Sequence, residues 1–186
     1  PTTIIVNIPI TVLTVAYLFY CKLFSCIKLR DKAFICRFTL LGEGVFHSHI
    51  EAKIKWPNDI YVGDRKICGM LIENTVRGKR LHTSIIGIGL NVNQRNFDVN
   101  LPNPTSMVLA REENTGMDSE AFDLNELLEE FMDIFTEYLD RFCHITGGYN
   151  RLSKLYHAQL WRLNEPAEFV DTARNVRFHG IIRGTS

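Results

Sequence analysis

The stretch that decides the fold of this chain is residues 52–93, AKIKWPNDIYVGDRKICGMLIENTVRGKRLHTSIIGIGLNVN. Apolar and polar side chains alternate over Ala52–Trp56, which is typical of a half-buried strand. Pro57 has no N–H for a strand ladder and therefore ends this strand. Further strands are predicted at residues 60–62, 66–73 and 81–92, joined by the turns Gly63-Asp64-Arg65 and Arg77-Gly78-Lys79. This pattern predicts a meander of antiparallel hairpins.

The last predicted strand carries glycines on one face only. Because alternate residues of a strand share a face, Gly87, Gly89 and Asn91 lie together, opposite a row of Ile, Leu and Val side chains. Glycines spaced by two indicate the close approach of a ligand or of another backbone. Gly69 clears the neighbouring strand in a similar way. The residues alone leave two interpretations open, a ligand face that ends in a hydrogen-bonding Asn91 and a strongly twisted strand.

The position of Lys66 conflicts with the parity of its strand. Lys66 and Gly69 are three residues apart, so a regular strand directs their side chains to opposite faces. Both residues can serve one site only if Lys66 precedes the regular strand or lies at a bulge. By residue type alone, Lys66 and Lys55 are ordinary surface lysines.

Beyond residue 93 the pattern changes from strands to helices. Residues 93–120 are polar and predict a loop with one helical turn around Ser106. Asp123 is the predicted N-cap of a long amphipathic helix, because Glu126 follows at the third position and apolar residues recur at helical spacing. Further elements are expected as helices within 31–51 and 149–160 and as short strands at 169–170 and 176–182.

The composition describes an ordinary globular protein. The 186 residues include 21 Lys and Arg against 21 Asp and Glu, and 46% of the residues are hydrophobic. These values exclude a disordered chain, a collagen-like chain and a generally basic nucleic-acid binder. The five cysteines are odd in number and contain no C-x-x-C pair, which favours a reduced, cytoplasmic protein. Their irregular spacing predicts no metal site.

Residues 1–21 contain no charged side chain. Strong β-branched enrichment at residues 4–8 and 11–17 predicts two buried strands. Asn7 and Pro9 interrupt the apolar run, which argues against a membrane-spanning helix of roughly 20 apolar residues. We expect no membrane association, and an anchor formed by residues 4–21 is the alternative.

Three blocks of sequence occur in a fixed order. They are Lys-Trp-Pro-Asn-Asp at 55–59, Arg-Lys-Ile-Cys-Gly-Met-Leu-Ile-Glu at 65–73 and Gly-Ile-Gly-Leu-Asn-Val-Asn at 87–93. Together they closely resemble the catalytic domain of bacterial biotin protein ligases. The resemblance is closest over residues 50–93 and continues more weakly to residue 161. The tail from Glu165 resembles the start of the small C-terminal β-barrel domain of that family.

The resemblance implies an α/β (α+β) fold, in which flanking helices cover a mixed, largely antiparallel sheet. This fold is related to class II aminoacyl-tRNA synthetases and lipoate ligases. The implied catalytic domain covers residues 1–161, of which 1–30 match poorly. A truncated C-terminal β-barrel-like segment follows at 162–186. Some family members dimerise through sheet edges, so a homodimer is one possible state.

The resemblance also implies a reaction in two steps. Biotin first attacks the α-phosphate of ATP, with Mg²⁺, and gives biotinyl-5′-AMP and pyrophosphate. The ε-amine of a lysine on a biotin carboxyl carrier domain then attacks this anhydride and releases AMP. By motif match, Lys66 contacts biotin and the α-phosphate, and Lys55 is a second positive group near the phosphates. Fixed cations stabilise the charge that spreads over the phosphate oxygens.

The remaining motif residues receive roles from the same resemblance. Asn58 and Asp59 lie where they can orient magnesium, ATP or the incoming lysine, and Asp59 is expected to position the acceptor amine. Asn91 is expected to contact the nucleotide. Close packing against the ligand is assigned to Gly69, Gly87 and Gly89.

Residues 1–50 depart from the family pattern. They contain no loop of the form G-R-G-R-x-G-R, and Arg30 and Arg37 are their only arginines. Because that loop covers biotin and the adenylate, we expect this chain, as written, to ligate biotin poorly or not at all. No N-terminal helix-turn-helix is present, so neither repressor activity nor a nucleic-acid partner is expected. The alternatives are a lipoate or octanoyl transferase and a non-catalytic module that binds carrier domains.

Overall fold

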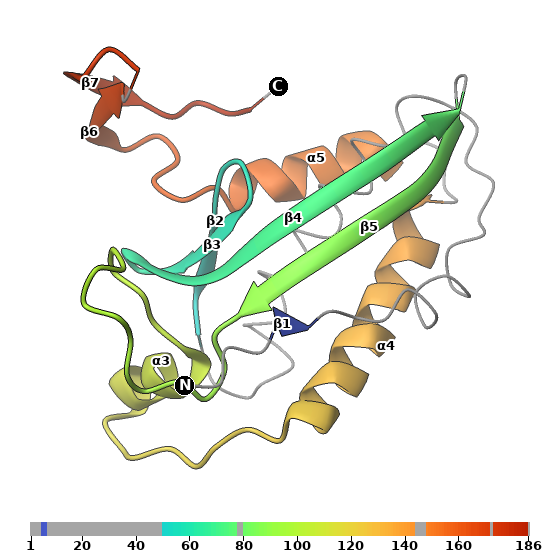
Figure 1. The fold of residues 1–186 in the computed structure, drawn as a ribbon. Helices are drawn as coiled ribbons and strands as arrows, with labels where there is room; N and C mark the ends of the chain where they lie inside the picture. Colours follow the sequence, from blue (N-terminus) through green and yellow to red (C-terminus); the bar gives the residue numbers. More distant parts are fainter. Residues whose placement is uncertain (1–4, 7–49, 78–79, 144–147, 172, 186) are drawn as a thin grey trace.

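The structure is a computed structural model that describes residues 5–6, 50–77, 80–143, 148–171 and 173–185. Its main sheet contains five strands in the order β1-β5-β4-β3-β2, and every neighbouring pair is antiparallel (Figure 1). The strands are β1 (Ile5–Val6), β2 (Ala52–Lys55), β3 (Asp59–Val62), β4 (Arg65–Arg77) and β5 (Arg80–Leu90). The predicted meander over residues 52–92 is confirmed, and β4 extends four residues beyond its predicted end at Glu73.

Part of the predicted N-terminal structure is confirmed. Within the predicted strand at residues 4–8, Ile5 and Val6 form β1 and pair with Gly89 and Ile88 of β5. The described residues do not include the predicted strand at 11–17, residues 31–49 of the predicted helix region, the tip of the turn at 78–79 or, apart from β1, the alternative anchor at 4–21. Among the helices that the structure describes, none is long and apolar enough to cross a membrane.

Three helices follow the sheet in sequence, α3 (Met107–Thr115), α4 (Leu124–Cys143) and α5 (Gly148–Ala158). The helix α4 begins as predicted, because the Asp123 carboxylate accepts hydrogen bonds from the backbone N–H groups of Asn125 and Glu126. The prediction of a single turn around Ser106 was wrong. Ser106 caps a helix of nine residues, which ends at Gly116 in the left-handed conformation.

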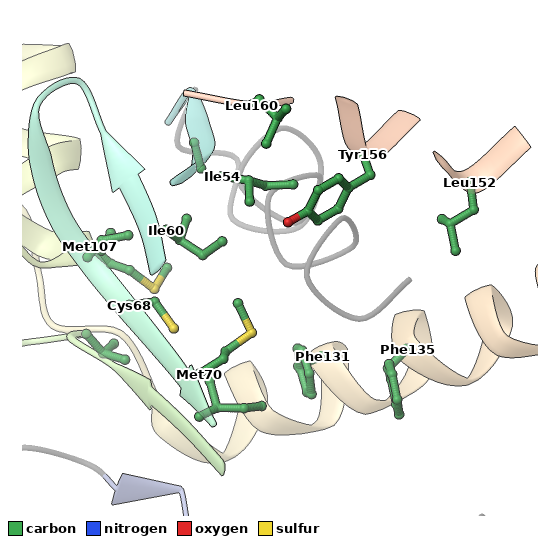
Figure 2. Packing of buried hydrophobic residues seen from close by; sticks show 14 residues of the cluster. Ile54, Ile60, Cys68, Met70, Met107, Phe131, Phe135, Leu152, Tyr156 and Leu160 are labelled. Atoms are coloured by element: carbon green, nitrogen blue, oxygen red, sulfur yellow. The ribbon is translucent and has the colours of Figure 1, made fainter. Parts of the chain in front are cut away.

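The hydrophobic core lies between one face of the sheet and the helices α4 and α5. Figure 2 shows Cys68 and Met70 of β4 directed toward Phe131 and Phe135 of α4. On the other side of this core, α5 contributes Leu152, which is completely buried. Complete burial of such an aliphatic side chain contributes about 1.5–3 kcal/mol. Because one face of β4 and β5 is buried in this way, any ligand must approach the other face.

Cys68 belongs to this core and not to the site. Its side chain is 1% exposed, and it is a free cysteine. Burial raises the pKa of the Cys68 thiol, although the nearby Lys66 acts in the opposite direction. The thiol therefore stays protonated at neutral pH and serves as a small apolar core group.

The C-terminal residues form a separate two-stranded antiparallel sheet of β6 (Pro166–Asp171) and β7 (Val176–Ile181). The rings of Phe169 and Phe178 stack across it with centroids 5.6 Å apart. This hairpin agrees with the predicted short strands. The barrel-like character of the tail and the domain boundary after residue 161 stay predictions.

Candidate active site on the open face of the sheet

A bulge in β4 places the Lys66 side chain on the same face of the sheet as Gly69. Ile60 of β3 pairs with Cys68, whereas the next residue, Tyr61, pairs with Lys66, so Ile67 is the extra residue. Ile67 turns into the core and is 4% exposed. Lys66 consequently shares a face with Gly69, and its Nζ lies 3.3 Å from the position that a Cβ on Gly69 would occupy. The sequence allowed Lys66 to lie either before the regular strand or at a bulge, and the structure has the bulge.

Lys66 and Asp59 form an ion pair on this open face. The Lys66 Nζ lies 2.7 Å from Asp59 Oδ1, and the two side chains are 42% and 23% exposed. Asp59 is the register partner of Gly69, so the glycine leaves room for the pair beside the sheet. A cation and a carboxylate thus meet at a partly screened surface that substrates can reach.

The glycines clear the neighbouring part of the same face. Gly69 pairs with Gly89, and Gly87 pairs with Leu71. Among the described atoms, a Cβ on Gly89 would meet only the Gly69 carbonyl oxygen, at 3.7 Å. The residues between the glycines point the other way, and Ile88 is 6% exposed. The structure therefore places backbone without side chains at Gly69 and Gly89 next to Lys66, and the approach of a ligand to this backbone stays a prediction.

Lys55 lies beside Asp59 but has different partners. The register of β2 and β3 places Lys55 directly opposite Asp59. Its Nζ donates a hydrogen bond of 2.9 Å to Tyr61 Oη and lies 4.6 Å from the centre of the Tyr61 ring. A cavity of about 580 Å³ begins at this end of β2 and is bordered by Lys55, Trp56, Trp161 and the β6–β7 hairpin.

The two predicted asparagines hold the framework of the site. Asn58 Nδ2 donates to the Met70 carbonyl oxygen at 2.7 Å, which ties the turn before β3 to β4. Asn91 Nδ2 donates to the Thr105 carbonyl oxygen at 2.9 Å, just before α3 begins. Both side chains therefore fix backbone positions around the open face, and direct ligand contacts from Asn58 and Asn91 stay predictions.

Tyr61 and Trp161 are the residues near the site that the sequence did not indicate. Alternation in β3 places Tyr61 on the face of Asp59, which is a signal that could have identified it. Trp161 is distant in sequence, and it reaches Tyr61 because residues 159–161 run beside Ile54 of β2. The ring centroids of Tyr61 and Trp161 are 5.4 Å apart.

A metal site built by the protein alone needs several donor side chains close together. Among the residues that the structure describes, no group of three or more His, Cys, Asp or Glu side chains could hold a metal ion. Magnesium usually keeps several waters and binds one or two carboxylates together with substrate phosphates. Asp59 on the open face fits that second arrangement and not a dedicated protein cage.

Comparison with known proteins shows which proteins this chain resembles. Residues 41–91 match the model of the Biotin/lipoate A/B protein ligase family. The chain is 32% identical over 123 residues to biotin–protein ligase 1, chloroplastic, of Arabidopsis thaliana, which covers 66% of this chain and 30% of that protein. It is 47% identical over 49 residues to the bifunctional ligase/repressor BirA of Bacillus subtilis, covering 26% of this chain and 15% of that protein.

The fold has the same relatives. A biotin protein ligase from Aquifex aeolicus in complex with biotin and ATP aligns with a TM-score of 0.59 at 23% identity, covering 84% of this chain and 60% of that chain. The similarity supports the predicted α/β fold, in which helices flank a sheet that is antiparallel over the described strands. The matched residues cover 30% of the Arabidopsis relative, so the chain spans about a third of that protein's length.

Proposed function

Because residues 41–91 match the biotin/lipoate A/B protein ligase family model and the chain is similar to biotin–protein ligases, we propose that it carries the catalytic site of an ATP-dependent biotin–protein ligase. The observation that carries the proposal is the Lys66–Asp59 pair of 2.7 Å beside a sheet face cleared by Gly69 and Gly89. This face offers a cation next to backbone that Gly69 and Gly89 leave without side chains, which suits an anionic ligand.

In the first step, the carboxylate of biotin attacks the α-phosphate of ATP. The new bond joins a biotin carboxylate oxygen to phosphorus, and pyrophosphate leaves with the electron pair of the broken P–O bond. Lys66 stabilises the charge on the phosphate oxygens and holds the carboxylate, while Lys55 adds a second positive charge nearby. Asp59 and Asn58 would orient a magnesium ion bound to the phosphates of ATP, and that ion would supply further positive charge.

In the second step, an acceptor lysine of a biotin carboxyl carrier domain attacks the acyl carbon of biotinyl-5′-AMP. An anionic ligand that takes over Lys66 frees the Asp59 carboxylate from its present partner. Asp59 then accepts a proton from the acceptor ammonium group. This role requires the ammonium group to bind within hydrogen-bond reach of the Asp59 carboxylate. Gly69 and Gly89 let the adenylate lie close enough to the sheet for this geometry.

Transfer of lipoate or octanoate is the second candidate function, since the matched family model describes both biotin and lipoate ligases. The two substrates differ in their apolar parts, and thermal unfolding separates the candidates. A biotin ligase is stabilised more by biotinyl-5′-AMP than by lipoyl-5′-AMP at equal concentration. The reverse order would favour the lipoate candidate.

A cytoplasmic location is part of the proposed function as a biotin–protein ligase, and it suits the free thiol of Cys68.

Replacement of Asp59 by asparagine is expected to slow the second step by about a hundredfold, because the amide cannot take a proton. The rate is measured as transfer of biotin from supplied biotinyl-5′-AMP to a purified carrier domain. Supplying the adenylate makes the result independent of the first step, which we expect to be slow. A second-step rate equal to that of the unaltered chain would remove Asp59 from the proposal.

The matched control for this variant is Asp171→Asn. Asp171 is the last residue of β6 in the separate two-stranded sheet, and it lies 3.8 Å from Arg174. The Asp171 variant is expected to transfer biotin at the unaltered rate, so a loss shared by both variants would indicate a change in folding and not in catalysis.

A further inference from the structure

Two lysines compete for one carboxylate on the open face of the sheet. Asp59 forms its ion pair with Lys66 at 2.7 Å, although Lys55 is its direct cross-strand partner. Opposite charges that face each other across an antiparallel pair normally attract, because their Cβ atoms are about 5 Å apart. Something must therefore keep the Lys55 ammonium away from Asp59.

Two aromatic rings provide that alternative for Lys55. Its Nζ donates to Tyr61 Oη at 2.9 Å and lies 4.6 Å from the Tyr61 ring centre. The same atom lies 5.5 Å from the centre of the Trp161 ring. An ammonium group within about 6 Å of an aromatic ring is attracted by the negative face of the ring. We call Tyr61 and Trp161 the aromatic clamp.

The aromatic clamp is anchored on both sides, so it can hold Lys55 in one place. Tyr61 is only 9% exposed and lies on β3, between β2 and β4. The Trp161 indole Nε1 donates to the Gly63 carbonyl oxygen at 2.9 Å, and its backbone N–H donates to Ile54 at 2.8 Å. The guanidinium of Arg162 lies 4.3 Å from the centre of the same indole ring.

We propose that Tyr61 and Trp161 are positioning residues that hold Lys55 off Asp59, so that the Asp59 carboxylate stays available to the acceptor amine. The inference rests on the proposed function, since it assigns the clamp to the second step. Lys66 leaves Asp59 when an anionic ligand binds, and without the clamp Lys55 would take its place. Asp59 would then be neutralised by a lysine of the protein instead of meeting the acceptor lysine.

The chemistry of the step is balanced without a further reactant. The acceptor ammonium gives one proton to Asp59, and its nitrogen then forms the C–N bond with the acyl carbon. The acyl carbon–oxygen bond of the anhydride breaks, and AMP leaves with that electron pair. The second proton on the nitrogen passes to solvent as the amide forms, and Asp59 later returns its own proton to solvent.

The test compares the second step in a cycle of variants, with saturating biotinyl-5′-AMP and a purified carrier domain. Tyr61→Leu removes the hydrogen bond and one ring from Lys55, and it is expected to slow transfer about tenfold. Lys55→Gln removes the competing cation. In the Lys55→Gln background, Tyr61→Leu is expected to have no further effect, because the lysine that would replace Lys66 at Asp59 is absent.

A purely structural role for Tyr61 predicts a different cycle. If Tyr61→Leu slows transfer equally with Lys55 and with Gln at position 55, the inference is overturned. Tyr61→Phe controls for misfolding, because it keeps the ring. It is expected to slow transfer less than Tyr61→Leu does and to have no effect on transfer in the Lys55→Gln background. Absence of any transfer by the unaltered chain would instead contradict the proposed function on which the inference rests.

A spectroscopic measurement tests the clamp without any activity. Protons next to the Nζ of Lys55 lie against two rings, so their NMR signals are expected at unusually high field in the unaltered chain. The shift should fall in Tyr61→Leu and vanish with the signal in Lys55→Gln, which assigns it. Lysine signals at ordinary positions only would overturn the inference whatever the transfer rate.

Discussion

Replacing Lys66 with methionine is expected to weaken binding of biotinyl-5′-AMP by about 10- to 100-fold, as measured by isothermal titration calorimetry. Lys66 is the cation of the open face and stands 2.7 Å from Asp59. A hydrogen bond to a charged group contributes about 1.5–3 kcal/mol, which corresponds to that range of affinity. Methionine keeps the length and flexibility of the side chain but removes its charge.

Lys53→Met is the matched control for this experiment. Lys53 lies on β2, in the same sheet, and forms an ion pair of 3.0 Å with Glu51. A surface pair of this kind contributes about 0–1 kcal/mol, so its loss leaves adenylate binding unchanged. If Lys66→Met binds the adenylate as tightly as Lys53→Met does, Lys66 is not a ligand contact and the proposed site is wrong.

Replacing Gly89 with valine is expected to abolish adenylate binding while the chain still folds. Valine suits a strand, and the nearest described atom to a new Cβ is the Gly69 carbonyl oxygen at 3.7 Å, an ordinary contact. The branched side chain would instead fill the cleared face beside Lys66. We expect affinity to fall at least about a hundredfold, whereas the thermal midpoint stays within about 4 °C of the unaltered value.

Gly116→Ala is the control for stability, because it is expected to destabilise the fold without changing adenylate binding. Gly116 ends α3 with a φ of 69°, a conformation that costs roughly 1 kcal/mol for a residue with a Cβ. This variant is expected to unfold at lower temperature and to bind the adenylate normally. Loss of binding in Gly116→Ala, or retained binding in Gly89→Val, would contradict the assignment of the cleared face.

The β-hairpins and their open face follow from the sequence because two local rules agree. Alternation gives the strands, and Gly87 with Gly89 marks the face without side chains. No local pattern in the sequence predicted the bulge. It was one of two ways to bring Lys66 and Gly69 to the same face. The register shift between Ile60 and Tyr61 now gives that geometry.

Other parts of the structure depend on contacts that a local pattern does not contain. The helix α3 was underestimated because its nine residues lie in a polar stretch, where Ser106 and Gly116 supply the caps. Trp161 joins the site because its backbone N–H donates a hydrogen bond to the carbonyl oxygen of Ile54, a residue far earlier in the chain. The amides of Asn58 and Asn91 donate to backbone carbonyl groups, a role that residue type alone does not separate from ligand binding.

The most direct measurement follows biotin from supplied biotinyl-5′-AMP onto a purified biotin carrier domain by intact-protein mass spectrometry. With the unaltered chain present, we expect one biotinyl group to appear on the carrier faster than in the spontaneous reaction without the chain. Asp59→Asn and Lys66→Met should reduce the rate toward the spontaneous value. A carrier that gains biotin no faster with the folded chain than without it would contradict the assignment of this open sheet face as the catalytic site of a biotin–protein ligase.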